Sequence, residues 1–77
     1  MPTVDIKADV TGKVWKLEAA AGAQLGAGDV VMILESMKME IPVEAPKAGQ
    51  LASLAVAEGD SVKEGQVLAR LEIQAGI

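Results

Sequence analysis

A lysine with methionine on both sides is the most distinctive chemical feature of this 77-residue sequence. Lys38 lies between Met37 and Met39 in the run ESMKME, residues 35–40, with Glu35 and Glu40 at its ends. The amine of a lysine can be acylated, which replaces its charge by an amide. Exposed methionine is a soft, adaptable contact surface that suits a transient partner. This pattern indicates a modified lysine whose neighbours provide an apolar surface for the added group, whereas an ordinary solvated lysine needs no such neighbours.

The composition argues against catalysis by the chain itself. The sequence contains no cysteine, no histidine and no tyrosine, so carboxylates, a few hydroxyls and lysines are the groups that remain. Glu40 and Glu44 can share one side of a strand, but such pairs are typical of a solvated surface. We therefore expect no catalytic residue, no metal centre and no disulfide. The absence of cysteine suits a reducing compartment, and we expect a cytoplasmic protein.

Charge and length exclude two further classes. The net charge is −4 and no basic run is present, which argues against nucleic acid and against an anionic membrane surface as partners. No stretch approaches the roughly 18 apolar residues of a membrane span. A chain of this length makes one domain, residues 1–77, too small to enclose a deep active-site cleft.

The sequence contains an internal repeat with two copies of one unit. Residues 8–35 align without a gap on residues 45–72, an offset of 37 positions, and nine of the 28 pairs are identical. Chance would supply about two or three identities at this composition. Glycines recur at equivalent places in both copies, between short apolar runs, which is typical of strands joined by turns. The repeat is therefore real.

These features predict an all-β fold: a flattened barrel-sandwich hybrid of two four-stranded antiparallel sheets, with the two copies related by a pseudo-twofold axis. The alanine-rich run at 18–23 is expected to end a strand in a turn, because so short a helix is marginal. In residues 67–72, alternation places Val67, Ala69 and Leu71 opposite Leu68, Arg70 and Glu72.

Residues 36–40, which lie between the two copies, are not explained by the repeat. We expect residues 36–40 to form a hairpin, in which Met37 and Lys38 would occupy a turn that prefers Asn-Gly because of its positive φ angles. A local rule broken in this way is typical of a functional site. Pro42 is expected in an edge strand or a bulge. The offset maps Lys38 onto Ala75 and Met1, so the hairpin and the chain ends should lie at opposite ends of the molecule.

At these residues the sequence resembles the biotinyl-domain family, which includes biotin carboxyl carrier domains of biotin-dependent carboxylases and small biotin/lipoyl attachment proteins. The resemblance covers nearly the whole chain. It includes the run ESMKME and the glycines Gly12, Gly22, Gly28, Gly49, Gly59 and Gly65.

The resemblance implies a carrier with covalent biotin. Lys38 would be joined to biotin by a biotin protein ligase, which must supply an activated acyl group because a lysine amine is almost entirely protonated near pH 7. The lysine side chain and the biotin tail would form a swinging arm of about 14 Å. A biotin carboxylase would load carboxyl on the biotin, and a carboxyltransferase would pass it to an acceptor such as an acyl-CoA, as in acyl-CoA carboxylases.

The resemblance also implies roles for the neighbours of Lys38. Met37 and Met39 would contact the partner or the biotin and support carboxylation more than attachment. Glu35, Ser36 and Glu40 would contribute to recognition by the ligase or a partner, although Glu35 matches Glu72 in the repeat and is also explained as a structural or surface residue.

Two other functions remain open on the sequence. A lipoyl carrier would use the same scaffold and the same lysine, but such domains usually have an acidic residue before that lysine and a small one after it. An unmodified barrel-sandwich adaptor is the second alternative, in which Val31 and Ile33 could form an outward apolar strip, unless they fill the second layer of the sandwich.

Overall fold

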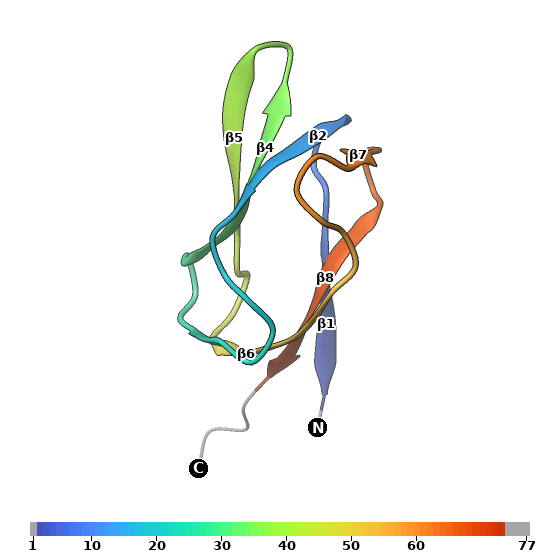
Figure 1. Cartoon of the computed structure of the whole chain (residues 1–77). Helices are drawn as coiled ribbons and strands as arrows, with labels where there is room; N and C mark the ends of the chain where they lie inside the picture. Colours follow the sequence, from blue (N-terminus) through green and yellow to red (C-terminus); the bar gives the residue numbers. More distant parts are fainter. Residues whose placement is uncertain (1, 74–77) are drawn as a thin grey trace.

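Two four-stranded antiparallel sheets form the structure (Figure 1), a computed structural model that describes residues 2–73. One sheet has the strand order β1-β8-β6-β3 and the other has the order β5-β4-β2-β7. The predicted all-β architecture is confirmed, and no helix occurs in residues 2–73. The strands are β1 (Thr3–Lys7), β2 (Gly12–Leu17), β3 (Gln24–Leu25), β4 (Val30–Ser36), β5 (Met39–Glu44), β6 (Gly49–Leu54), β7 (Ser61–Val62) and β8 (Val67–Ile73).

The internal repeat of the sequence is also the symmetry of the fold. Adding 37 to the bounds of β2, β3 and β4 gives the bounds of β6, β7 and β8. The same shift takes β1 onto β5, so each sheet contains two strands from each copy. Each copy places two of its strands in one sheet and two in the other, which ties the two sheets together. The predicted pseudo-twofold arrangement is therefore confirmed.

Aliphatic side chains from both sheets fill the space between them. Met32 and Leu34 of one sheet and Leu51 and Leu71 of the other are completely buried. No polar or charged side chain in residues 2–73 is buried with them. The core comprises Ile6, Ala8, Val14, Val31, Met32, Leu34, Ala45, Leu51, Val62, Leu68, Ala69 and Leu71.

Strict alternation of side chains fails in β4 and at the equivalent position of β8. Val31 is the extra residue where β4 pairs with β5, and Leu68 is the extra residue where β8 pairs with β1. A β-bulge of this kind inserts one residue and resets the side-chain period. Both side chains are completely buried. The prediction that Leu68 shares one face of the strand with Arg70 and Glu72 is therefore wrong.

The bulge at Val31 in β4 also bears on the adaptor alternative, which needs Val31 and Ile33 to form an outward apolar strip. Val31 packs in the core, whereas Ile33 is half-buried. An outward strip formed by these two residues is therefore excluded.

Residues 18–23 leave β2 and enter a turn at Ala21 and Gly22, as the sequence predicts. Gly22 has a φ of 95°, a conformation that L-residues with a side chain rarely adopt. Its repeat partner Gly59 has a φ of 92°. Gly22 and Gly59 thus mark equivalent turns in the two copies. The described residues include no helix long and apolar enough to cross a membrane.

Candidate functional site

The hairpin that joins β4 and β5 has only Met37 and Lys38 in its turn. Ser36 pairs with Met39 and Glu35 pairs with Glu40, so the strands remain in register up to the turn. Met37 has a φ of 53° and Lys38 a φ of 64°. Two consecutive left-handed residues are what a tight hairpin turn of this length requires, and glycine or asparagine usually supplies them. A methionine and a lysine hold this conformation at a cost of about 1–2 kcal/mol each.

The side chains of this turn extend into solvent. Met37 is 92% exposed and Met39 is 63% exposed, which is unusual for such apolar residues. Lys38 is exposed as well, and its amine makes no hydrogen bond or ion pair within residues 2–73. The amine is therefore free to react with an acyl donor.

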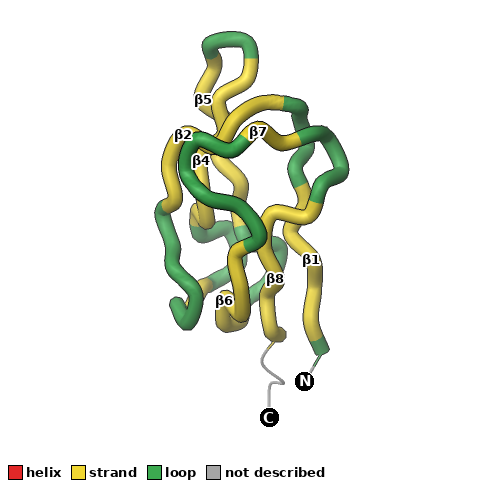
Figure 2. Tube along the Cα trace, turned by 45° about the vertical axis from the view of Figure 1, so that its right-hand side comes forward, coloured by secondary structure: helices red, strands yellow, loops and turns green. Residues whose placement is uncertain are grey.

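The hairpin projects beyond the rest of its sheet. In Figure 1 it extends past β2 and β7 at one end of the molecule, while β1 begins and β8 ends at the opposite end. Figure 2 shows the same separation from a second direction. Met1 and Ala75, onto which the repeat maps Lys38, lie outside the described residues. The long axis of the sandwich thus separates Lys38 from both Thr3 and Ile73.

Two other residues predicted for the site, Glu35 and Glu40, lie just below the turn, beside Lys13, which the sequence did not single out. Lys13, Glu35 and Glu40 are opposite one another on β2, β4 and β5, and all three are exposed. Two carboxylates and one amine therefore share the outer face of the sheet beneath Lys38. A partner that approaches the turn from this side meets charged groups.

Ser36 is not an open contact point. It is half-buried, and its Oγ donates a hydrogen bond of 2.8 Å to the carbonyl oxygen of Thr11. Thr11 was not among the residues that the sequence singled out. The signal was present in the repeat, where Thr11 aligns with Ala48, so the hydroxyl is specific to one copy.

A third exposed apolar side chain lies further along the same sheet. Trp15 is 49% exposed, at a bulge where β2 pairs with β4. The equivalent residue on the other sheet is Ala52, which also lies at a bulge. The bulge occurs in both copies and is therefore a feature of the fold. The tryptophan occurs in one copy only, so the fold does not require it.

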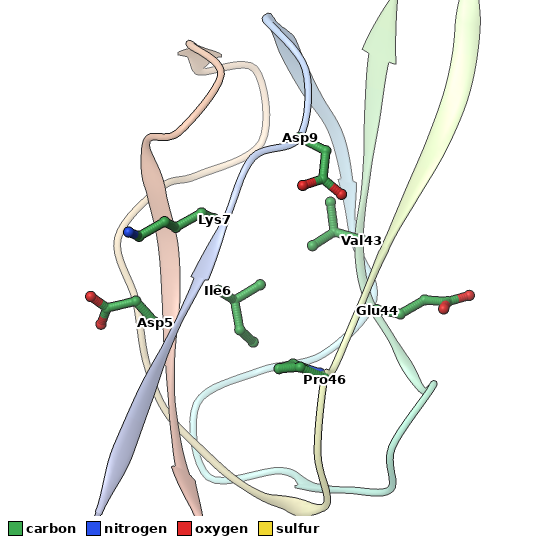
Figure 3. Close-up of a pocket in the computed structure, with 7 residues that line it drawn as sticks. All are labelled: Asp5, Ile6, Lys7, Asp9, Val43, Glu44 and Pro46. Carbon is green, nitrogen blue, oxygen red and sulfur yellow. The ribbon is translucent and has the colours of Figure 1, made fainter.

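A hollow of about 260 Å³ lies between the edge strands β1 and β5, and no residue of the hairpin at 36–40 lines it. Figure 3 shows Ile6, Val43 and Pro46 pointing into it, while Asp5 and Glu44 point away. Its floor is the side of the apolar core, where the two sheets are not joined by hydrogen bonds. Within residues 2–73, no group of three or more acidic side chains is placed to hold a metal ion. The hollow lacks the converging polar groups of an active site.

Comparison with known proteins gives one consistent result. Residues 4–71 match a biotin/lipoyl family described as "Biotin-requiring enzyme". A biotin/lipoyl attachment protein of Bacillus subtilis is 46% identical over 69 residues, which cover 90% of this chain and 92% of that protein. A biotinylated protein TB7.3 homolog of Mycobacterium leprae is 42% identical over 65 residues, which cover 84% of this chain and 92% of that protein.

The fold has a close counterpart in a far larger enzyme. The crystal structure of the Kluyveromyces lactis urea carboxylase superposes with a TM-score of 0.89 and 35% identity. The match covers 94% of this chain but 6% of the carboxylase chain, so the shared part is one small region of that enzyme. Matches over almost the whole lengths of two small relatives and over residues 4–71 of the family agree on one assignment. The chain belongs to the biotin/lipoyl family of non-catalytic carrier domains.

Proposed function

We propose that Lys38 is the residue on which this biotin carrier holds its biotin, attached by a biotin protein ligase. The observation that supports the proposal is the free amine of Lys38 at the tip of a projecting hairpin. A ligase active site must enclose that amine, and a two-residue turn can enter a cleft that the flat face of a sheet cannot. The exposed side chains of Met37 and Met39 flank the same point.

The attachment reaction forms one amide bond. The amine of Lys38 loses its extra proton to become a nucleophile, and Nζ then attacks the activated carboxyl carbon of biotin. The activating group, derived from ATP, leaves with the bonding electrons, and Nζ gives up a second proton. The product carries one biotin less one water, and the positive charge of the lysine is lost. The chain supplies the nucleophile, and the ligase supplies the activation.

The residues around Lys38 fit the attached group. Within residues 2–73 no element lies above the turn, so the extended arm would be free to swing between distant sites. Met37 and Met39 provide adaptable apolar surface beside the arm. Bound biotin supplies a ureido nitrogen that carries a carboxyl group. Tethering keeps that group at a high effective concentration near each partner site.

The partners belong to the same proposal. The chain is too small to contain the two catalytic centres, so a biotin carboxylase and a carboxyltransferase would lie in other domains or polypeptides of a biotin-dependent carboxylase. Similarity to part of the urea carboxylase supports a carboxylase as the partner class. A cytoplasmic location is part of the proposal, because the chain contains no cysteine to benefit from an oxidising compartment.

Incubation of the purified chain with a biotin protein ligase, biotin and ATP tests the proposal. We expect intact mass to rise by one biotin less one water, with capture on avidin. Lys38→Arg keeps the charge but should reduce the modification to background. Lys47→Arg, in the loop before β6, is the matched control and should be modified like the unaltered chain.

Two results would contradict this assignment. Modification that persists in Lys38→Arg would place the biotin on another lysine. Modification by a lipoate ligase in preference to the biotin protein ligase, when both act in competition, would favour the lipoyl carrier.

A further inference from the structure

Two hydroxyl groups tie the hairpin to the body of the protein. Ser36 Oγ donates to the carbonyl oxygen of Thr11 at 2.8 Å, and Thr11 Oγ1 accepts from the main-chain N–H of Glu64 at 3.1 Å. Thr11 lies in the loop between β1 and β2, and Glu64 lies in the turn between β7 and β8. These two hydrogen bonds, here called the Thr11 bridge, connect three segments that are far apart in the sequence.

The Thr11 bridge lies where the regular ladder has ended. The pairing of β2 with β4 stops at Lys13 and Glu35, one residue before Ser36. Gly12, the first residue of β2, pairs instead with Val62 of β7. Of the contacts that connect the projecting hairpin to the rest of the sandwich, the hydrogen bond of the Ser36 hydroxyl is thus the one nearest to Lys38.

The internal repeat shows that the fold does not require this bridge. Ser36, Thr11 and Glu64 correspond to Ile73, Ala48 and Ala27 at the opposite end. Neither Ile73 nor Ala48 has a hydroxyl, so neither bond can form there. The main-chain ties of the two ends are nevertheless equivalent. The N–H of Gly65 donates a hydrogen bond of 2.8 Å to the carbonyl oxygen of Ala8, and the N–H of Gly28 donates one of 2.9 Å to the carbonyl oxygen of Ala45.

A feature that occurs only at the lysine end of a symmetric fold serves that end. We propose that Ser36 and Thr11 are positioning residues that hold the β4–β5 hairpin at a fixed angle to the sandwich, so that the ligase meets Lys38 in one orientation. This inference rests on the proposed function. A ligase that binds a hairpin already held in one orientation does not have to order it. The conformational entropy lost on binding is therefore smaller, and the carrier binds more tightly.

Steady-state kinetics of the ligase, with this chain as the varied substrate, test the inference. Ser36→Ala removes the donor to Thr11. We expect its KM to rise about two- to tenfold, the range expected for loss of one net hydrogen bond, and its kcat to stay unchanged because the bound geometry is restored. Thr11→Val removes the acceptor of the Glu64 N–H but leaves the Thr11 carbonyl, so its KM should rise less.

Conservative variants separate positioning from general stability. Ser36→Thr and Thr11→Ser keep the hydroxyls and should restore the KM of the unaltered chain. Ser53→Ala removes an exposed hydroxyl from β6 on the opposite sheet and should leave KM unchanged. If Ser36→Ala lowers the melting temperature but leaves KM unchanged, the bridge is merely structural and the inference is wrong.

A second measurement needs no ligase. Amide ¹⁵N relaxation of Met37 and Lys38 should report an order parameter near 0.85 in the unaltered chain and a clear decrease in Ser36→Ala. Equal order parameters in the two proteins would overturn the positioning role. If the ligase fails to modify the unaltered chain while these order parameters differ, the proposed function fails and the rigid hairpin stands.

Discussion

Gly12 lies so close to the main chain of Glu35 that a β-carbon on Gly12 would collide with the Glu35 carbonyl oxygen. The equivalent pair in the other copy, Gly49 and Glu72, has the same geometry. Glu35 is the last residue of β4 that pairs with β2, and the chain continues from it through Ser36 to the turn with Lys38. The close approach of two main chains at this point fixes where the hairpin leaves the sheet.

Alanine at either of these glycines should therefore destabilise the protein. The obstructing atoms belong to the main chain and cannot move aside as a flexible side chain would. We expect Gly12→Ala and Gly49→Ala each to lower the free energy of unfolding by about 2–3 kcal/mol, measured by urea denaturation. Gly26→Ala is the control, since its nearest neighbour is the Asp29 carboxylate at 3.6 Å. A loss as large at Gly26 would contradict the explanation.

The strained turn should be a place where stability can be gained. Asparagine adopts left-handed conformations several times more readily than methionine. We expect Met37→Asn to raise the free energy of unfolding by about 0.5–1 kcal/mol, which corresponds to an increase of about 3–6 °C in melting temperature. Met39→Asn, at a strand position, should bring no such gain. A Met37→Asn protein no more stable than the original would mean that the turn is not strained.

Chemical oxidation should distinguish the methionines by their exposure. Met37 and Met39 are largely exposed, whereas Met32 is completely buried. Mild peroxide treatment of the folded protein should therefore convert Met37 and Met39 to sulfoxides and leave Met32 unmodified, as read by peptide mass spectrometry. The same treatment in denaturant should modify all three. Oxidation of Met32 at an equal rate in the folded chain would contradict its placement in the core.

The two exposed methionines should matter for partner encounters and not for folding. We expect Met37→Ala combined with Met39→Ala to change the melting temperature little, because neither side chain is in the core. Ligase-catalysed attachment should proceed at nearly the original rate. The rate at which a biotin carboxylase carboxylates the attached biotin, measured by incorporation of radioactive bicarbonate, should fall about tenfold. The reason is the loss of apolar contact between the two methionines and the carboxylase. A matched fall in both reactions would argue for a role in presenting Lys38 itself.

Several features of this protein follow from local sequence. The offset of 37 residues predicts the paired strands, because two copies with the same apolar and glycine pattern must fold alike. Met37 and Lys38 stand out because a two-residue turn needs positive φ, and neither residue adopts it readily. Pro42 lies, as expected, on the edge strand β5. Edge strands are where a sheet tolerates a residue that has no main-chain N–H. The turn and the proline are interpreted from residues within a few positions of one another, and the strands from comparing one copy of the repeat with the other.

Other features were decided by the tertiary structure alone. The inward turn of Leu68 depends on a bulge against β1, and pairing between strands about sixty residues apart in the sequence sets that bulge. Thr11 meets Ser36 across 25 positions and Glu64 across 53, contacts that no local pattern specifies. Local conformational preferences thus identified the lysine and the shape of its turn. Only the close packing of distant strands determined which groups hold that turn in place.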